Sequence, residues 1–417
     1  MMSYNDSVDM KQLAFLTRKH ISFNTSVMSR NLDTFLLEAA SHLRAMPPSS
    51  EPAKHIVVAV GNESADLDSI ISSLAFSFLS HTITPNPTPT VHLPLTNIPR
   101  ADLQLRPEVV HVLTSNSLSP NNLLFTEGLP HLTPHHTSLV LLDHNRLTAP
   151  FAEPAWSSHI MGILDHHVDE ELYTTQNLHF RVIKPVGSAT SLVLHHFLPA
   201  WKTFLTPSPI TPSAWSSVLA RLMLAPILVD TVNLRSEHGR TTALDVSAAE
   251  FLISQVRTTD TAFSPDAYYT SIQKARTQVS HLSTTDLLRK DYKEWTTSNK
   301  FRVGISSVSW SIAAWAEREG GVSRLVNGVR EFAKERELDL AVVMTGFDKE
   351  RGFERELVVV VMEERLRQVV VEELEGEGGK MLEVRALEGG EGVYRQGNIR
   401  MSRKQVWPLV KGWVERV

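Results

Sequence analysis

Three short apolar runs in the first half of the chain constrain its fold more than any other feature. They are "HIVVAV" (55–60), "SLVLLD" (138–143) and "IMGILD" (160–165). Continuous apolar runs of this length are typical of strands that are buried on both faces of a parallel sheet. Helical patterns such as "DSIISSLAFSFLS" lie between them. The pattern predicts an α/β domain with a mostly parallel sheet and helices on both faces. We interpret residues 81–99 and 114–137, which are rich in Pro, Ser, Thr and Asn, as surface loops.

Helical patterns frame this core. "NLDTFLLEAASHLRAM" predicts a helix that Pro47 and Pro48 stop, and "AWSSVLARLMLAPILVDT" predicts a helix that is interrupted at Pro226. A polar stretch from about 265 to 297 also has helical spacing, and we expect a domain boundary within it.

The second half of the chain has its own set of apolar runs. Four apolar runs, "FRVGISSVSW", "LDLAVVMTGF", "ELVVVVME" and "MLEVRALEGG", predict the strands of a second, smaller α/β domain, with a helix over "SRLVNGVREFAKERE". We interpret "VEELEGEGGK" as a solvated loop or strand edge. The predicted parts are an N-terminal helical extension packed on the first domain (1–54), the first domain (55–260), a helical linker or hinge (261–285) and the second domain (286–417).

Composition excludes several classes of protein. The formal net charge of −5 and the pI of about 6.4 argue against a general nucleic-acid-binding protein. The absence of cysteine excludes disulfides, thiolate nucleophiles and zinc-thiolate sites, and it is compatible with a reducing compartment. No run approaches the roughly 20 apolar residues of a membrane span. We therefore expect a soluble, cytoplasmic protein with no membrane attachment.

Carboxylates follow the buried runs, and this is the pattern that indicates chemistry. Asp66 and Asp68 follow the first run, Asp143 and Asp165 end the next two, and Asp230 ends the predicted helix. Ligands of an open parallel sheet bind beyond the carboxyl ends of its strands, so these acids are expected in one crevice. A single such Asp is usually a helix cap or turn residue.

Several acids that converge beside His166 and His167 repel one another unless cations hold them. Oxygen-rich ligands with one or two imidazoles suit Mg²⁺, Mn²⁺ or Co²⁺ better than zinc. Two such ions about 3.5 to 4 Å apart generate hydroxide at neutral pH and clamp a phosphoryl displacement. The other histidine pairs, His135-His136 and His195-His196, lack neighbouring acids, so we assign them structural or surface roles.

These motifs resemble a known family. "GNESADLDS", "LLDHN", "LDHH" and "VDT", in this order, are similar to the four signature motifs of the DHH phosphoesterase superfamily. "LLRKDYKEW", "KFRVGISSV" and "RQGNIRMSRKQV" resemble the DHHA2 domain that is shared by family II inorganic pyrophosphatases, eukaryotic exopolyphosphatases and prune proteins. The resemblance spans about residues 55 to 410.

The resemblance implies a role for each matching residue. The implied ligands of two divalent ions are Asp66, Asp68, Asp143, His166 and Asp230, with Asp143 bridging the ions. His167 would face the substrate as a donor or general acid, and Asp165 would orient the histidines. Lys293, Arg403 and Lys404 would bind the phosphate chain. Asn62 stands where family II pyrophosphatases carry a histidine ligand, so it is assigned to the substrate side, and tight Mn²⁺ binding is in doubt.

The predicted activity is metal-dependent removal of terminal phosphate from inorganic polyphosphate. Arg395 and Arg400 extend the basic segment toward the substrate, although a solvated basic face explains both equally simply. Alternatives are an inorganic pyrophosphatase, a prune-like phosphodiesterase or short-chain polyphosphatase, and a prune-like interaction protein without activity. We expect polyphosphate as the partner, with no nucleic acid and no obligatory protein partner, and a monomer.

Overall fold

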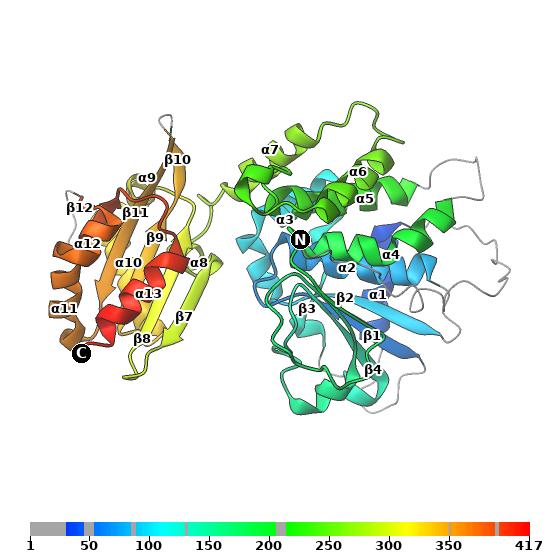
Figure 1. Ribbon diagram of the computed structural model, residues 1–417, viewed down its shortest axis with the longest axis horizontal. Coiled ribbons are helices and arrows are strands. Elements are labelled where there is room, and N and C mark those ends of the chain that lie inside the picture. The colour runs from blue at the N-terminus through cyan, green and yellow to red at the C-terminus, as the bar shows by residue number, and fades with distance from the viewer. Residues whose placement is uncertain are drawn as a thin grey trace, which may run out of the picture. The chain divides into compact units, whose positions relative to one another are not determined.

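The computed structural model describes residues 31–45, 54–84, 89–129, 132–205, 214–349, 352–387 and 392–417. These residues form two separate sheets, each covered by helices (Figure 1). The predicted helix near the N-terminus is present as α1 (Leu32–Arg44), whereas residues 1–30 and the Pro47-Pro48 stop lie outside the described residues. None of the helices in these ranges combines the length and the apolar character that a membrane crossing requires.

The first sheet contains six strands in the order β3-β2-β1-β4-β5-β6, and all neighbouring pairs are parallel. The strands are β1 (His55–Val60), β2 (Thr90–Thr96), β3 (Leu124–Phe125), β4 (Thr137–Leu142), β5 (Ile160–Asp165) and β6 (Phe180–Ile183). The three runs identified in the sequence are the adjacent central strands β1, β4 and β5. Because these strands are parallel, their carboxyl ends lie at the same end of the sheet.

Burial on both faces explains why the runs are continuously apolar. On one face, Val57 and Val140 join a core with the first-sheet helices, and on the other Val58 and Leu139 pack against Trp156 and its neighbours. Besides α1, these helices are α2 (Leu67–Ile83), α3 (Pro107–Ser115), α4 (Ala189–Leu205), α5 (Ala214–Asp230), α6 (Ala243–Val256) and α7 (Pro265–Arg276). The predicted fold class is confirmed.

The second sheet is mixed. Its path is β12-β13-β11-β9-β8-β7, and β10 pairs with β11 beside it. The strands are β7 (Tyr292–Thr296), β8 (Arg302–Val308), β9 (Leu340–Thr345), β10 (Phe347–Lys349), β11 (Gly352–Val361), β12 (Val384–Ala386) and β13 (Val393–Gln396). Helices α8 (Thr284–Lys290), α9 (Ile312–Glu319) and α10 (Val322–Glu335) pack on one face, and α11 (Glu364–Glu375), α12 (Glu377–Leu382) and α13 (Arg403–Val414) pack on the other.

Two sequence predictions fail where proline misleads. Residues 81–99 are not a loop, because they contain β2, which lies inside the sheet between β1 and β3. Pro94 argued against an inner strand because it cannot donate to a ladder, yet the buried Leu93 and Leu95 hold the strand in the core. Helix α5 runs through Pro226 without a break, since its residues there are fully packed.

The polar segments of the second half also differ from prediction. The helical stretch expected up to 297 ends at Lys290, and Tyr292–Thr296 is the edge strand β7. "VEELEGEGGK" is not a loop, because it forms the end of α11 and most of α12. Gly378 is buried where a side chain would strike the Trp413 ring, so the Gly-rich composition reflects close helix packing. The predicted domain limits stay predictions.

Candidate metal centre

Asp143 lies at the centre of the candidate site. It follows β4 directly, and its backbone N–H donates to Leu164 O of β5 at 3.0 Å. Its φ of 63° is left-handed, a conformation that Asp tolerates better than most residues and that is common at functional sites. The strand end therefore turns the buried carboxylate toward the residues that follow β5.

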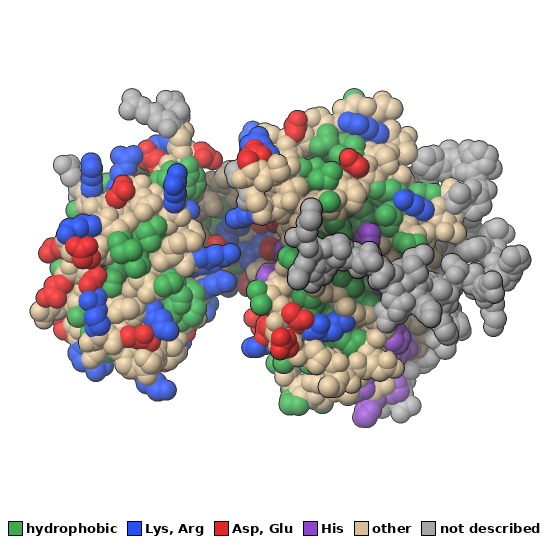
Figure 2. All heavy atoms as spheres, viewed as in Figure 1, with side chains coloured by type: hydrophobic (Ala, Val, Ile, Leu, Met, Phe, Trp, Pro, Cys, Tyr) green, Lys and Arg blue, Asp and Glu red, His purple; other side chains and the backbone are tan. Residues whose placement is uncertain are grey.

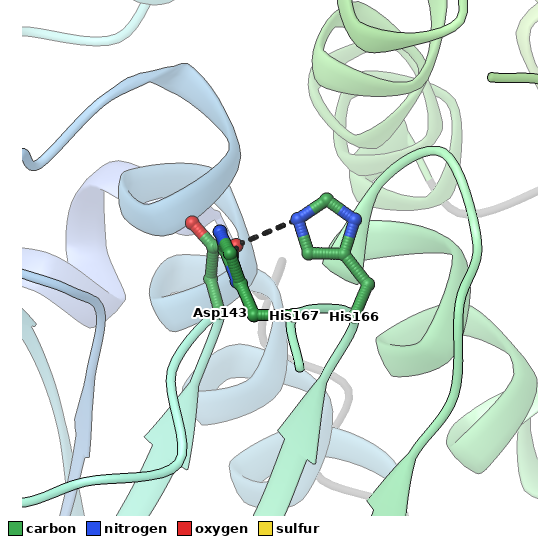
Figure 3. A group of neighbouring side chains, drawn as sticks. All are labelled: Asp143, His166 and His167. Carbon is green, nitrogen blue, oxygen red and sulfur yellow. Dashed lines mark ion pairs between the residues drawn. The ribbon is translucent and has the colours of Figure 1, made fainter. Parts of the chain in front are cut away.

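The two carboxylate oxygens of Asp143 have different surroundings. Oδ2 accepts hydrogen bonds from Ser69 Oγ at 2.6 Å and from Asn62 Nδ2 at 2.8 Å. Oδ1 is buried and accepts no well-formed hydrogen bond from the described residues, although His166 Nε2 lies 3.1 Å away and His167 Nδ1 3.6 Å away. The protein thus holds one oxygen and leaves the other facing two imidazoles (Figure 3).

Each imidazole is fixed by its other contacts. His166 Nδ1 lies 2.9 Å from the carbonyl of Val186, so Nδ1 carries the proton and Nε2 is directed at Asp143. His167 Nδ1 lies 2.8 Å from Asp165 Oδ1, which leaves its Nε2 directed elsewhere on a half-exposed ring. Asp165 is fully buried, and its second oxygen accepts from Asn145. Asp165 therefore contacts the ring of His167, whereas the ring of His166 is held by Val186, and the predicted orienting role of Asp165 stays a prediction.

The remaining acids are held in different ways. Asp66 caps α2, accepting from Ser69 N at 3.0 Å. Asp68 accepts from Ser188 Oγ at 2.6 Å, Ala189 N at 2.6 Å and both the N–H and the hydroxyl of Thr190, so the start of α4 orients it. Asp230, the last residue of α5, has a buried Oδ2 without a hydrogen-bond partner in the described ranges.

The acidic side chains of the site outnumber its basic ones, and this excess of negative charge shifts the pKa values of its residues. Burial and the charge of Asp68 raise the pKa of Asp143 to about 7. Burial and the charges of Asp68, Asp66 and Asp143 raise the pKa of Asp230 well above its usual value. Burial alone would lower the pKa of His166, but its close contact with Asp143 and the charge of Asp68 raise it to about 10.

The donor set fits a divalent cation. In the described part of the chain, Asp143, His166 and His167 each offer a ligand atom within 4.8 Å of the others. The unpaired oxygens of Asp143 and Asp230 are what a cation would satisfy. Asp66, Asp68 and Asp230 do not join that tight group. The charge of Asp68 nevertheless raises the pKa of both Asp143 and His166, and the charge of Asp143 raises the pKa of Asp230. The ligand assignments made from the sequence stay predictions.

The side-chain amide of Asn62 is hydrogen-bonded to Asp143. Its Nδ2 donates to the Asp143 carboxylate and to the Asp143 backbone carbonyl, and its Oδ1 accepts from the N–H and hydroxyl of Ser64 at 2.9 and 2.6 Å. The amide oxygen, which is the atom a metal would bind, is therefore already engaged. In this arrangement Asn62 positions a carboxylate.

The predicted phosphate-binding residues belong to the second sheet and its helices. Arg403, the first residue of α13, donates to the Asp291 carbonyl at 2.7 Å and to its carboxylate at 2.6 Å. Lys293 on β7, Lys404 and Arg400 are exposed. Arg395 pairs with Glu354 at 2.7 Å, which favours a surface role. Figure 2 shows Lys and Arg side chains interspersed with Asp and Glu over much of the visible face.

Sequence reasoning missed several residues of the site. Ser69 and Asn145 hold Asp143 and Asp165, and Arg106 donates to the Ser64 carbonyl at 3.1 Å, beside Asp66. Asp245 is a further such residue, because its carboxylate is fully buried and accepts four hydrogen bonds. The run "TTALD" carries the signal of a capping box, whereas Arg106 has no sequence signal.

Comparison with known proteins identifies the family. Residues 56–227 match the N-terminal domain of the DHH family, and residues 270–413 match the DHHA2 domain. A Schizosaccharomyces pombe protein, provisionally named an exopolyphosphatase, is 30% identical over 383 residues, which are 90% of this chain and 94% of that protein. The chain therefore belongs to the DHH family, and it combines the DHH domain with a DHHA2 domain.

Two further relatives also have the names of phosphate-releasing enzymes. Exopolyphosphatase PRUNE1 of Rattus norvegicus is 28% identical over 381 residues, or 88% of this chain and 77% of that protein. A Clostridium acetobutylicum protein, provisionally named a manganese-dependent inorganic pyrophosphatase, is 27% identical over 254 residues, or 61% and 70%. These are names of phosphoanhydride hydrolases, which agrees with the enzyme class predicted from the sequence.

A solved structure supports the fold. A Methanococcus jannaschii protein, provisionally described as a family II inorganic pyrophosphatase, aligns with a TM-score of 0.52 and 21% identity, covering 86% of this chain and 99% of that one. At this identity the likeness concerns the fold alone.

Proposed function

We propose that this chain is a cytoplasmic, metal-dependent exopolyphosphatase that hydrolyses the terminal phosphate of inorganic polyphosphate. The observation that carries the proposal is the buried Oδ1 of Asp143. It accepts no hydrogen bond from the described residues and faces His166 and His167, while Oδ2 is held by Ser69 and Asn62. The names of the S. pombe and R. norvegicus relatives support the substrate class.

The proposed cofactor is a pair of divalent ions, Mg²⁺ or Mn²⁺, with Co²⁺ as a further candidate. Asp143 and His166 would hold them together with Asp66, Asp68 and Asp230. When bound, such ions lower the pKa of water and neutralise charge on the phosphoryl group. The manganese dependence in the name of the C. acetobutylicum relative supports a divalent metal.

The chain's own residues prepare the site in two ways. The backbone carbonyl of Val186 fixes the His166 ring so that Nε2 is available to a metal. Asp165 holds His167 at Nδ1, and that hydrogen bond raises the pKa of His167. His167 can therefore keep a proton on Nε2 and donate it to the phosphate group that leaves.

Asn62 supports the exopolyphosphatase over the pyrophosphatase alternative. Family II pyrophosphatases, which the site resembles, carry a histidine ligand there, whereas here the amide is committed to Asp143 and Ser64. A weaker metal site without that imidazole suits a substrate whose own oxygens complete the coordination.

The decisive experiment is phosphate release measured side by side on four substrates. Long polyphosphate, tripolyphosphate, pyrophosphate and cyclic AMP are each tested with Mg²⁺, Mn²⁺ and Co²⁺. The proposal expects long polyphosphate to have the highest kcat/KM with at least one metal. A preference for pyrophosphate or cyclic AMP supports the corresponding alternative, and no turnover on any of the four supports an interaction protein.

A further inference from the structure

The segment between β6 and α4 supplies the contact that orients His166. The carbonyl of Val186 lies 2.9 Å from His166 Nδ1. The next residue, Gly187, donates its N–H to Asp245 Oδ2 at 2.8 Å. The Val186 carbonyl and the Gly187 N–H belong to the same planar peptide group, so the hydrogen bond from Gly187 to Asp245 also fixes the carbonyl that holds the imidazole.

Asp245 is built into α6 so that it can hold this segment firmly. It is the third residue of α6 and is fully buried. Its Oδ2 also accepts from the N–H and hydroxyl of Thr242, at 2.9 and 2.7 Å, and its Oδ1 accepts from Ser191 Oγ at 2.7 Å. One carboxylate thus joins the cap of α6 to both ends of the 187–191 stretch.

The packing at Gly187 leaves the segment no room to shift. A Cβ at this position would lie 2.4 Å from Thr231 Cγ2 and 2.9 Å from the Arg240 carbonyl. Asp68 binds the same stretch from the other side, through Ser188, Ala189 and Thr190. The segment is therefore clamped between two buried carboxylates, one of which belongs to the candidate metal centre.

We propose that Asp245 is a positioning residue of the metal centre, acting through Gly187 and Val186 on His166. The proposal rests on the metal-dependent function proposed above. Asp245 itself contacts no predicted ligand, so it acts only by fixing the backbone. Partners of metal ligands that act in this way commonly change metal affinity by about 10- to 100-fold when they are removed.

The test is Mn²⁺ binding to substrate-free protein by titration calorimetry, with three matched variants. Asp245→Ala removes the acceptor of the Gly187 N–H and should raise the Kd for Mn²⁺ by about 10- to 100-fold. Asp245→Asn should restore most of the affinity, because its amide oxygen can accept from Gly187 while its nitrogen donates to Ser191 Oγ. Thr242→Ala weakens the α6 cap without breaking the Gly187 contact, so it should lower Tm but leave the Kd unchanged.

A fourth variant keeps the test decisive if Asp245→Ala does not fold. Gly187→Ala keeps the Asp245 carboxylate in the chain and displaces the same segment through its contacts with Thr231 and the Arg240 carbonyl, so it should also weaken Mn²⁺ binding. The proposal is overturned if Gly187→Ala or a folded Asp245→Ala binds Mn²⁺ like wild type, if Thr242→Ala weakens binding as much as Asp245→Ala, or if wild type binds no Mn²⁺. Because no substrate is present, a failure of the polyphosphate assay leaves this result unaffected.

Discussion

The carboxyl end of the first sheet and the start of α13 hold their charged groups in opposite ways. In the first region, Asp143 and Asp165 are buried, and neighbouring donors fix their oxygens. In the second, Lys404 is exposed, and Arg403 is bound to an exposed aspartate, Asp291. The first region holds its charged groups by buried hydrogen bonds, whereas the second presents an exposed lysine and a surface ion pair at the start of a helix.

This difference follows from what each region is proposed to bind. A small cation needs several ligand atoms at fixed separations, and strand ends and buried hydrogen bonds provide them. A phosphate chain is recognised through charge at longer range, and long side chains can reach it from the surface. Substitutions in the first region should therefore affect metal binding and turnover, whereas substitutions in the second should affect the binding of polyphosphate.

The largest effect is expected for Asp143→Asn. The substitution removes the charge at the oxygen that faces His166 and His167, so phosphate release should fall by about 10²- to 10³-fold while the fold is kept. Circular dichroism and turnover measured together check this. Asp260→Asn, which alters a partly exposed ion pair with Arg221, is the control and should remain active. Activity above a tenth of wild type, taken as a rough limit, would remove Asp143 from the proposed central role.

The next effect concerns the two cations at the start of α13. Arg403→Ala and Lys404→Ala should each reduce kcat/KM on polyphosphate by roughly 10- to 150-fold, because charge-assisted contacts to phosphate contribute about 1.5 to 3 kcal/mol. Mn²⁺ affinity should stay unchanged in both variants. Lys411→Ala, on the same helix and near Glu415, is the matched control.

The salt dependence of these variants sharpens the comparison. Raised ionic strength should weaken polyphosphate binding more in wild type than in either variant, since each variant already lacks one of the attractions that salt screens. The loss should appear mainly in KM if the cation binds upstream phosphates, and also in kcat if it binds the scissile one. Wild-type kinetics at low salt in both variants would mean that the start of α13 is simply a basic surface.

A smaller effect is expected for Asn62→His. The substitution removes the donor to Asp143 Oδ2 and supplies an imidazole, so Mn²⁺ should bind roughly tenfold more tightly and the rate ratio should shift toward pyrophosphate. Titration calorimetry and rates on both substrates measure this. Ser64→Ala, which removes the hydroxyl donor to the Asn62 amide oxygen but keeps the backbone N–H donor, is the control. An unchanged Kd would place residue 62 outside the metal's direct ligands.

The smallest effect is a pH dependence of the metal-free protein. The folded-state pKa of Asp143, raised by burial and Asp68 to about 7, lies above its unfolded value of about 3.9. Burial lowers the folded-state pKa of His166, but Asp143 raises it to about 10. This pKa also exceeds the unfolded value of about 6.5. Both groups bind protons more tightly when folded, so their stabilisation is lost as pH rises.

Calorimetry with a chelator at about pH 6.5 and about pH 8 should therefore show Tm falling by a few degrees at the higher pH. Above about pH 8 the slope is mixed, because burial lowers the pKa of Lys290 to about 8 and this lysine acts in the opposite direction. Mn²⁺ should reduce or reverse the fall, since it binds the deprotonated carboxylates. A Tm that rises between these pH values without metal would contradict the assigned charges.

In the first region the sequence predicted the strand ends but not the contacts that hold them. The strands that end in Asp143 and Asp165 were predictable because burial on two faces leaves an unmistakable apolar run, and parallel strands bring their ends together. β2 was missed because Pro94 hides an inner strand. The contacts of Ser69, Asn145 and Asp245 were beyond prediction, since each joins positions that are distant in the chain and have no shared periodicity.

The hydrogen bonds that Asp68 accepts have a consequence for local motion. The first N–H groups of a helix have no partner within the helix, and in α4 those of Ala189 and Thr190 are satisfied by a residue of α2. Their protection from solvent exchange therefore depends on the contact between two helices and not on the winding of α4 itself. Slow deuterium uptake at these two amides would report that α2 stays docked, and faster uptake there would mark the two helices separating before either one unwinds.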